Sequence, residues 1–272
     1  MDRSARAPRL FVPFSALTLL SALLALPAPA GQAVEEKFEK TYDAAGVDRL
    51  RLQNVNGPVR VVTWERPHIK VHAVKRAKGS NAEEAVARTE IRVTKQGSTI
   101  DVETILPKPT RTWGLFEWGN RSGAEVTYEL ALPASLPVDV ETVNGRVTAE
   151  HRLAPLTLNT VNGSVRVEAH DAPVHVNTVN GSVEVSFAGA LRTAELETVN
   201  GSITVACGRD SSFRYDLQTV NGKIRSDFPE VTVEGKWGPK EARGAVADGR
   251  GRLAVETVNG EVRIVAVDPA AR

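Results

Sequence analysis

The sequence predicts an all-β protein, a parallel β-solenoid of about 19-residue rungs with one short helix in its amino-terminal part. The tripeptide Val-Asn-Gly occurs seven times, and its last six glycines are separated by 18, 18, 20, 21 and 38 residues. Apolar and polar residues alternate on both sides of each turn, which is typical of half-buried strands. We interpret the interval of 38 as two periods, with one decayed repeat near Gly238 to Gly244.

The repeated turns predict a ladder of identical side chains. Stacked rungs bring equivalent residues about 4.8 Å apart, a distance at which asparagine amides hydrogen-bond to one another. Each glycine is expected to supply a turn conformation that is closed to residues with a Cβ atom. The predicted turn ladder consists of Asn144, Gly145, Asn162, Gly163, Asn180, Gly181, Asn200, Gly201, Asn221, Gly222, Asn259 and Gly260.

A second architecture fits the same repeat. Asn-Gly between two alternating runs is also a strong signal for a β-hairpin, so an antiparallel meander or barrel competes with the solenoid. Identity at equivalent positions favours the solenoid, because a hairpin turn does not require it. Repeats of this length are also typical of stacked units.

The first thirty residues have the features of a cleaved signal peptide. Three arginines precede an uncharged apolar run from Leu10 to Leu26, and Ala28-Pro29-Ala30 offers a small-x-small cleavage pattern. The run has 17 residues, whereas a membrane span needs roughly 20. We therefore expect cleavage after Ala30, with Ala33 as the second choice, export to the periplasm or the cell surface, and no transmembrane span in the mature chain.

Two regions follow the signal peptide. Residues 34–124 are predicted to form an amino-terminal β region, in which Ser80 and Glu83 make a capping-box pattern for a short helix from Asn81 to Thr89. An aromatic loop within this region either covers the end of the solenoid or contacts a partner. The candidate partner-binding residues of this loop are Trp113, Phe116 and Trp118. Residues 125–268 are predicted to form the solenoid repeat domain.

Charge and motif content exclude several classes of function. Residues 1–30 contain three arginines and one aspartate, so the remaining chain carries 31 basic and 32 acidic side chains. This balance argues against nucleic-acid binding. The five histidines lack zinc-site spacing, and Cys207 ends an alternating run as an inward-facing small hydrophobe. We expect no metal, no cofactor and no catalytic residue.

A carbohydrate-active β-helix enzyme is the catalytic alternative, because it would use carboxylates along one face. Glycoside cleavage needs two carboxylates at a set separation. The equivalent outward position of successive rungs mixes acids with amides, which indicates a solvated polar row. This row contains Glu141, Asn159, Asn177, Glu197, Gln218 and Glu256.

The repeated Thr-Val-Asn-Gly-Ser-Val behind a signal peptide resembles the bacterial β-strand repeat proteins named putative adhesins, a domain of unknown function. The resemblance covers Leu50 to Val267, including the stretch Val59 to Ala73 around Trp64. It implies a parallel β-solenoid associated with the cell envelope. Residues 229–250 and the aromatic loop depart from the repeat.

Residues and resemblance together predict an exported, non-catalytic interaction module that contacts an envelope polymer or protein. A periplasmic regulatory partner in envelope stress is the alternative that would use the aromatic loop. The sequence predicts no particular oligomeric state.

Overall fold

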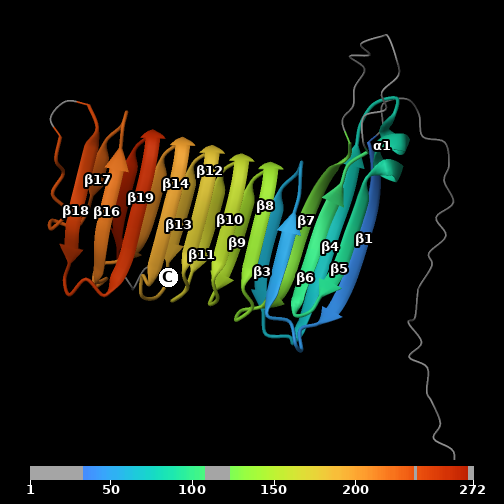
Figure 1. Ribbon diagram of the computed structural model, residues 1–272, viewed down its shortest axis with the longest axis horizontal. Helices are drawn as coiled ribbons and strands as arrows, with labels where there is room; N and C mark the ends of the chain where they lie inside the picture. Colours follow the sequence, from blue (N-terminus) through green and yellow to red (C-terminus); the bar gives the residue numbers. More distant parts are fainter. Residues whose placement is uncertain (1–32, 108–122, 236–237, 269–272) are drawn as a thin grey trace, which may run out of the picture.

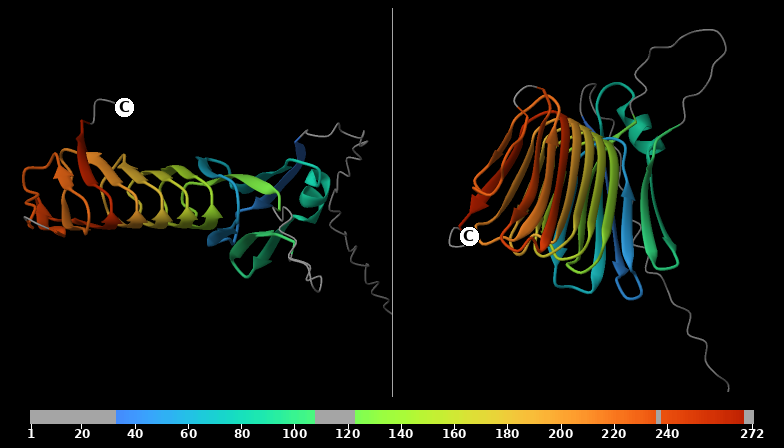
Figure 2. Two further views of the ribbon diagram at one scale, coloured as in Figure 1. Left: turned by 90° about the horizontal axis from the view of Figure 1, so that it is seen from above. Right: turned by 60° about the vertical axis from the view of Figure 1, so that its left-hand side comes forward.

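The computed structural model describes residues 33–107, 123–235 and 238–268, which form two ten-stranded β-sheets stacked face to face (Figure 1). Seen from above, the sheets run as two layers along the whole molecule (Figure 2). Sheet A has the order β1 (Val34–Asp43), β4 (His68–Ala77), β7 (Glu125–Pro133), β3 (Val59–Trp64), β9 (Val147–Arg152), β11 (Val165–Ala169), β13 (Val183–Phe187), β15 (Ile203–Gly208), β20 (Val262–Val267) and β17 (Ile224–Ser226). Sheet B has the order β18 (Lys240–Val246), β16 (Phe213–Thr219), β19 (Gly251–Asn259), β14 (Thr193–Asn200), β12 (Val174–Asn180), β10 (Leu156–Asn162), β8 (Val138–Asn144), β2 (Arg49–Gln53), β6 (Thr99–Ile105) and β5 (Glu90–Gln96).

The repeat strands pair in parallel, which confirms the all-β prediction and excludes the meander for this part of the chain. Each Val-Asn-Gly turn carries the chain from a strand of sheet B to a strand of sheet A, so it is not a hairpin turn. The sheets are nevertheless mixed. Antiparallel pairs occur toward their ends, between β1 and β4, β4 and β7, β5 and β6, and β16 and β18.

The spacing between paired residues is not uniform. Val174 pairs with Leu156, 18 positions earlier, and with Ala194, 20 positions later. Ala194 then pairs with Leu253, because β19 lies between β14 and β16. The prediction that a decayed repeat continues the period near Gly238 to Gly244 is wrong. Residues 240–246 form β18, which runs antiparallel to β16 at the edge of sheet B.

Both sheets continue across residue 125, where the sequence suggested a boundary. Strand β2 pairs with β8, and β3 pairs with β9, so amino-terminal strands extend the stack of the repeats. The predicted helix is present as α1 (Ala82–Arg88) and packs near β4 and β1 (Figure 1). The capping-box prediction is wrong, because Asn81 is the N-cap and makes no capping hydrogen bond through its side chain.

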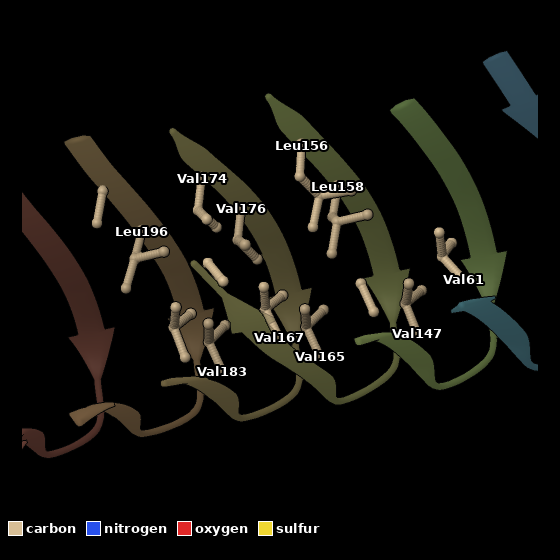
Figure 3. Close-up of a cluster of buried hydrophobic side chains, with 14 of the residues drawn as sticks. Val61, Val147, Leu156, Leu158, Val165, Val167, Val174, Val176, Val183 and Leu196 are labelled. Atoms are coloured by element: carbon tan, nitrogen blue, oxygen red, sulfur yellow. The ribbon is translucent and has the colours of Figure 1, made fainter. Parts of the chain in front are cut away.

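The space between the sheets is filled mainly by inward-facing aliphatic side chains (Figure 3), together with buried rings such as those of Tyr128 and Phe187. Val165 of one rung, for example, lies between Val147 and Val183 of its neighbours, and all three are buried. Burial of each such side chain stabilises the fold by roughly 1.5–3 kcal/mol. Cys207 is buried in this core, as predicted. In the described part of the chain, no helix has the length and apolarity needed to cross a membrane.

Candidate functional site

The asparagines of all seven turns lie on one edge of the stack, where sheet B passes into sheet A. In six successive steps, the Nδ2 atom of one asparagine donates a hydrogen bond to the Oδ1 atom of the next, over 2.7–2.9 Å. The structure thus brings the predicted ladder residues together, and the first Val-Asn-Gly turn joins them. The donors run in the order Asn221, Asn259, Asn200, Asn180, Asn162 and Asn144, and the last acceptor is Asn56.

The ladder glycines are needed for a different reason from the expected one. Of the seven turn glycines, Gly57 alone has a positive φ, so the expected turn conformation is wrong for the other six. Their neighbours approach too closely for a side chain instead. A Cβ atom on Gly163 would lie 1.9 Å from the carbonyl oxygen of Gly145. Close stacking of the rungs therefore requires glycine at this position.

A row of exposed valines follows the ladder. The side chains are 40–44% exposed and belong to the same Val-Asn-Gly turns. We call this row and the amide ladder together the turn edge. Its exposed valines are Val143, Val161, Val179, Val199 and Val220.

The predicted polar row lies on the outer face of sheet B. Glu197 and Glu256 are register partners on adjacent strands, because β19 is inserted before β16. Both are exposed, and neither lines the groove described next. Within the described residues, no group of three His, Cys, Asp or Glu side chains could hold a metal ion.

A long groove crosses the outer face of sheet A near the carboxyl ends of its strands. Its volume is about 1030 Å³. Because Val185 and Phe187 point into the core, the intervening Ser186 and the following Ala188 face outward. We call this hollow the strand-end groove. It is lined by Thr63, Trp64, Glu65, Arg66, Pro67, Pro133, Ala134, Ser135, Leu153, Glu168, Ala169, His170, Ser186, Ala188, Ala206 and Val267.

Small side chains form the middle of the groove and larger ones form its ends. Ser186, Ala188 and Ala206 come from the neighbouring strands β13 and β15 and the residue after β13. Trp64 ends β3 at one side, and Val267 ends β20 at the other. The groove therefore spans the ends of β7, β3, β9, β11, β13, β15 and β20, which lie next to one another in sheet A. Six strand spacings amount to about 29 Å.

Local contacts fix the Trp64 end. The indole Nε1 atom donates a hydrogen bond to the carbonyl oxygen of His68 over 2.8 Å. The Arg66 guanidinium lies 5.3 Å from the centre of the ring, a cation–π distance. The backbone N–H of Ala44 donates to the carbonyl oxygen of Pro67 over 3.0 Å and holds the β3–β4 turn against the neighbouring loop. The indole is therefore held in place without a ligand.

A buried arginine lies directly behind this end. Arg152 is fully buried and donates hydrogen bonds to the carbonyl oxygen of Leu136 and, over 3.3 Å, to Thr63 Oγ1. Its Nε atom has no partner, and no carboxylate in the described residues pairs with it. Burial lowers the pKa of Arg152 to about 10. An uncompensated cation in a core is costly, so it places positive charge close to the groove at the expense of stability.

Sequence reasoning missed Arg152 and the groove. Strand β9 carries an irregularity opposite β11 between Val167 and Ala169, which turns Arg152 toward the core. The groove had a weak signal, since outward Ser186, Ala188 and Ala206 are unusually small for solvent-facing strand positions. The predicted contact residues Trp113, Phe116 and Trp118, and the signal peptide, lie outside the described residues.

The family described as Toastrack DUF4097 matches residues 137–265. No curated protein matches the sequence. The chain is similar to the solved structure of a putative cell adhesion protein from Clostridium sporogenes, with 14% identity and a TM-score of 0.47, over 86% of this chain and 100% of that one. A putative adhesin from Bacteroides fragilis has 12% identity and a TM-score of 0.42, over 85% and 97% of the two chains. A putative lipid binding protein from Parabacteroides distasonis has 10% identity and a TM-score of 0.29, over 84% and 96%.

Proposed function

We propose that this chain, a member of the Toastrack family through residues 137–265, is an exported, non-catalytic β-solenoid of about 19-residue rungs that binds an extended envelope polymer or protein. The ligand lies in the strand-end groove, along the axis of the stack. The shape of the groove is the observation that carries this proposal. A hollow that crosses seven neighbouring strands matches a long, narrow ligand, whereas a compact substrate would touch two or three of them.

The chemistry of the groove also suits an elongated, amphipathic ligand. Alanine and valine side chains offer an apolar surface, while Ser186, Glu168 and Arg66 offer hydrogen-bonding groups along it. Trp64 supplies a rigid aromatic surface at one end, and tryptophan is enriched among residues that dominate binding energy. Glu65, Glu168 and His170 also line the groove. We propose binding rather than turnover because the groove extends along the stack instead of enclosing a compact substrate.

A substitution that fills the groove with a large side chain tests the proposal. Ala206→Trp places a large ring on the groove floor, and Thr204→Trp places the same ring two residues earlier on the same face of β15, outside the lining. The probes are insoluble peptidoglycan sacculi and an immobilised capsular polysaccharide, measured by co-sedimentation. We expect the wild type and Thr204→Trp to sediment with one of these polymers and Ala206→Trp to lose most of this binding. Equal binding by both variants would contradict the groove as the contact surface.

Trp64→Ala separates the aromatic end from the rest of the groove. Removing a binding tryptophan costs about 2 kcal/mol or more, which corresponds to roughly a 30-fold weaker dissociation constant. Thermal unfolding of the variant is the control for folding. A well-folded Trp64→Ala protein with unchanged affinity would show that the indole has no role in binding.

Export has its own test. The full chain, tagged at its carboxyl end and expressed in a bacterial host, is fractionated and its amino terminus is read by mass spectrometry. We expect a mature chain that begins at residue 31 and lies outside the cytoplasm. An uncleaved chain in the cytoplasm would contradict export.

A further inference from the structure

Each of the seven turns contains Asn-Gly, the dipeptide in which an asparagine amide is most easily lost. Glycine has no side chain to hinder its backbone nitrogen from attacking the Cγ atom of the preceding asparagine. The attack needs a glycine N–H that can release its proton and an asparagine side chain that can rotate toward it. The structure controls both conditions, and it does so unequally along the ladder.

In the interior turns, the glycine N–H is held by the next rung. Each donates to the backbone carbonyl oxygen of an asparagine in the adjacent turn over 2.8–3.1 Å. The asparagine side chains are held as well, since each interior amide both donates and accepts in the ladder. The held N–H groups belong to Gly57, Gly145, Gly163, Gly181 and Gly201.

In the last two turns of the stack, the glycine N–H is not held by a neighbouring turn. Among the described residues, the N–H groups of Gly260 and Gly222 have no acceptor. Asn221 is also the end of the ladder. Its Nδ2 atom donates to Asn259 Oδ1 over 2.9 Å, but no donor in the described chain reaches its own Oδ1. Asn259 ends strand β19, whereas Asn221 lies in a bend beyond the end of β16.

We propose that Asn221 is a site of spontaneous deamidation, and that the stacked rungs protect the interior Asn-Gly pairs from the same reaction. The Gly222 nitrogen forms a bond to Cγ of Asn221, the Cγ–Nδ2 bond breaks, and ammonia leaves with the proton from Gly222. Water then opens the resulting succinimide at either carbonyl and gives an aspartyl or an isoaspartyl residue. The net change is one amide and one water converted to a carboxylic acid and ammonia.

The product disrupts the ladder at its end. An aspartate at 221 replaces the donating Nδ2 with a carboxylate oxygen, which faces Asn259 Oδ1 as a second acceptor. The hydrogen bond between the last two rungs is lost, and two electronegative oxygens are brought together. Deamidation is therefore expected to loosen β16 and its edge partner β18, while the ladder hydrogen bonds from Asn200 to Asn56 are kept.

Peptide mapping by mass spectrometry tests the site. The native protein and a urea-unfolded sample are incubated in parallel in mildly alkaline buffer, and deamidation is followed at each Asn-Gly. In the native protein we expect Asn221 to react about tenfold or more faster than Asn144, Asn162 and Asn180, because those turns must first open locally. In the unfolded sample these rates should converge. Equal native rates at Asn221 and the interior sites would overturn the proposal.

Asn221→Asp tests the consequence. We expect faster hydrogen exchange in residues 213–219 and 240–246 of this variant, with exchange in residues 156–187 unchanged. Native protein that has aged in buffer should develop the same pattern. Unchanged exchange in β16 and β18 of the variant would overturn the proposed loosening.

Discussion

Replacement of Gly163 by alanine tests whether the rungs are held as closely as their geometry indicates. The new Cβ atom would lie 1.9 Å from the carbonyl oxygen of Gly145 and 2.7 Å from its carbonyl carbon. Contacts of a Cβ atom below 3.0 Å are essentially never found, so the two turns must separate by about 1 Å. Both neighbours are backbone atoms, and no rotation of a side chain relieves the clash.

The separation breaks specific hydrogen bonds between these rungs. Gly145 N–H donates to the carbonyl oxygen of Asn162 over 3.0 Å, and Val147 N–H donates to that of Ser164 over 3.0 Å. Asn162 Nδ2 donates to Asn144 Oδ1 over 2.8 Å. A bond lengthened by 1 Å is lost, at about 1 kcal/mol each. We therefore expect Gly163→Ala to lower the free energy of unfolding by about 3 kcal/mol.

Urea unfolding and thermal unfolding measure this effect. For a chain of this size, 3 kcal/mol corresponds to a fall in melting temperature of about 6–12 °C. Gly208→Ala is the matched control, because the nearest atom to its new Cβ is Asp210 Oδ1, the movable end of a side chain. A Gly163→Ala protein within about 0.5 kcal/mol of the wild type, as is usual for surface substitutions, would refute the close-stacking argument.

Three further predictions concern the ladder and the core. Asn162→Ala removes two ladder hydrogen bonds and should lower the free energy of unfolding in urea by about 1–2 kcal/mol. Asn221→Ala removes one ladder hydrogen bond and should lower it by about half as much. Equal losses in the two variants would contradict additive contributions of the ladder bonds. Burial raises the pKa of the Cys207 thiol to about 11, because the folded core disfavours the charged thiolate. The neutral thiol therefore contributes its full stabilisation below the ordinary thiol pKa near 9, and this contribution is lost as the pH rises toward 11. Across this pH interval, the free energy of unfolding of the wild type should fall by about 2–3 kcal/mol because of this thiol, and that of Cys207→Ala should fall by correspondingly less. Parallel pH profiles of the two proteins would contradict the raised pKa of Cys207. Arg152→Met removes an uncompensated buried cation and should leave the unfolding free energy unchanged or raise it by about 1–2 kcal/mol, and a loss above about 2 kcal/mol would show that its bonds to Leu136 and Thr63 matter more than its desolvation.

The fold was largely predictable because its regularity is local. Alternation sets which side chains face the core, and repetition of Thr-Val-Asn-Gly favours stacking of like residues. The structure accordingly contains parallel pairs such as Asn162 with Asn180, in which identical residues are register partners. The antiparallel ends were not predictable from this pattern. They depend on pairing between segments such as β1 and β4, and β16 and β18, which carry no repeated motif.

The candidate site was harder to predict, because it depends on which strands become neighbours. Trp64 and Val267 are separated by most of the chain, yet they end the same groove. Small residues at outward positions were visible in the sequence, but a hollow forms only when β11, β13, β15 and β20 align them between bulkier ends. Arg152 was hidden further by the irregularity in β9, since simple alternation does not apply across it.

The inserted position of β19 is explained by the partners that the aromatic side chains of β16 find at the end of the stack. Interior rungs of sheet B point aliphatic residues inward, as Leu253 and Val255 do in β19. Strand β16 points Phe213 and Tyr215 inward instead. At the end of the stack they find room, because Gly244 of β18 faces Tyr215 and a Cβ atom there would lie 2.5 Å from the phenol oxygen.

The end of the stack also supplies partners for these rings. The Tyr215 hydroxyl donates to the carbonyl oxygen of Glu230 over 2.8 Å, and the Phe213 ring packs edge-on against Phe228 with 5.4 Å between centroids. Both partners come from residues 229–250 or the segment just before them, the part that departs from the repeat. The segment that departs from the repeat and the aromatic residues of β16 therefore pack together and form one cap. A rung that needs such a cap belongs at the end of the stack, so the next aliphatic rung in the sequence, β19, has to pair on its inner side with β14.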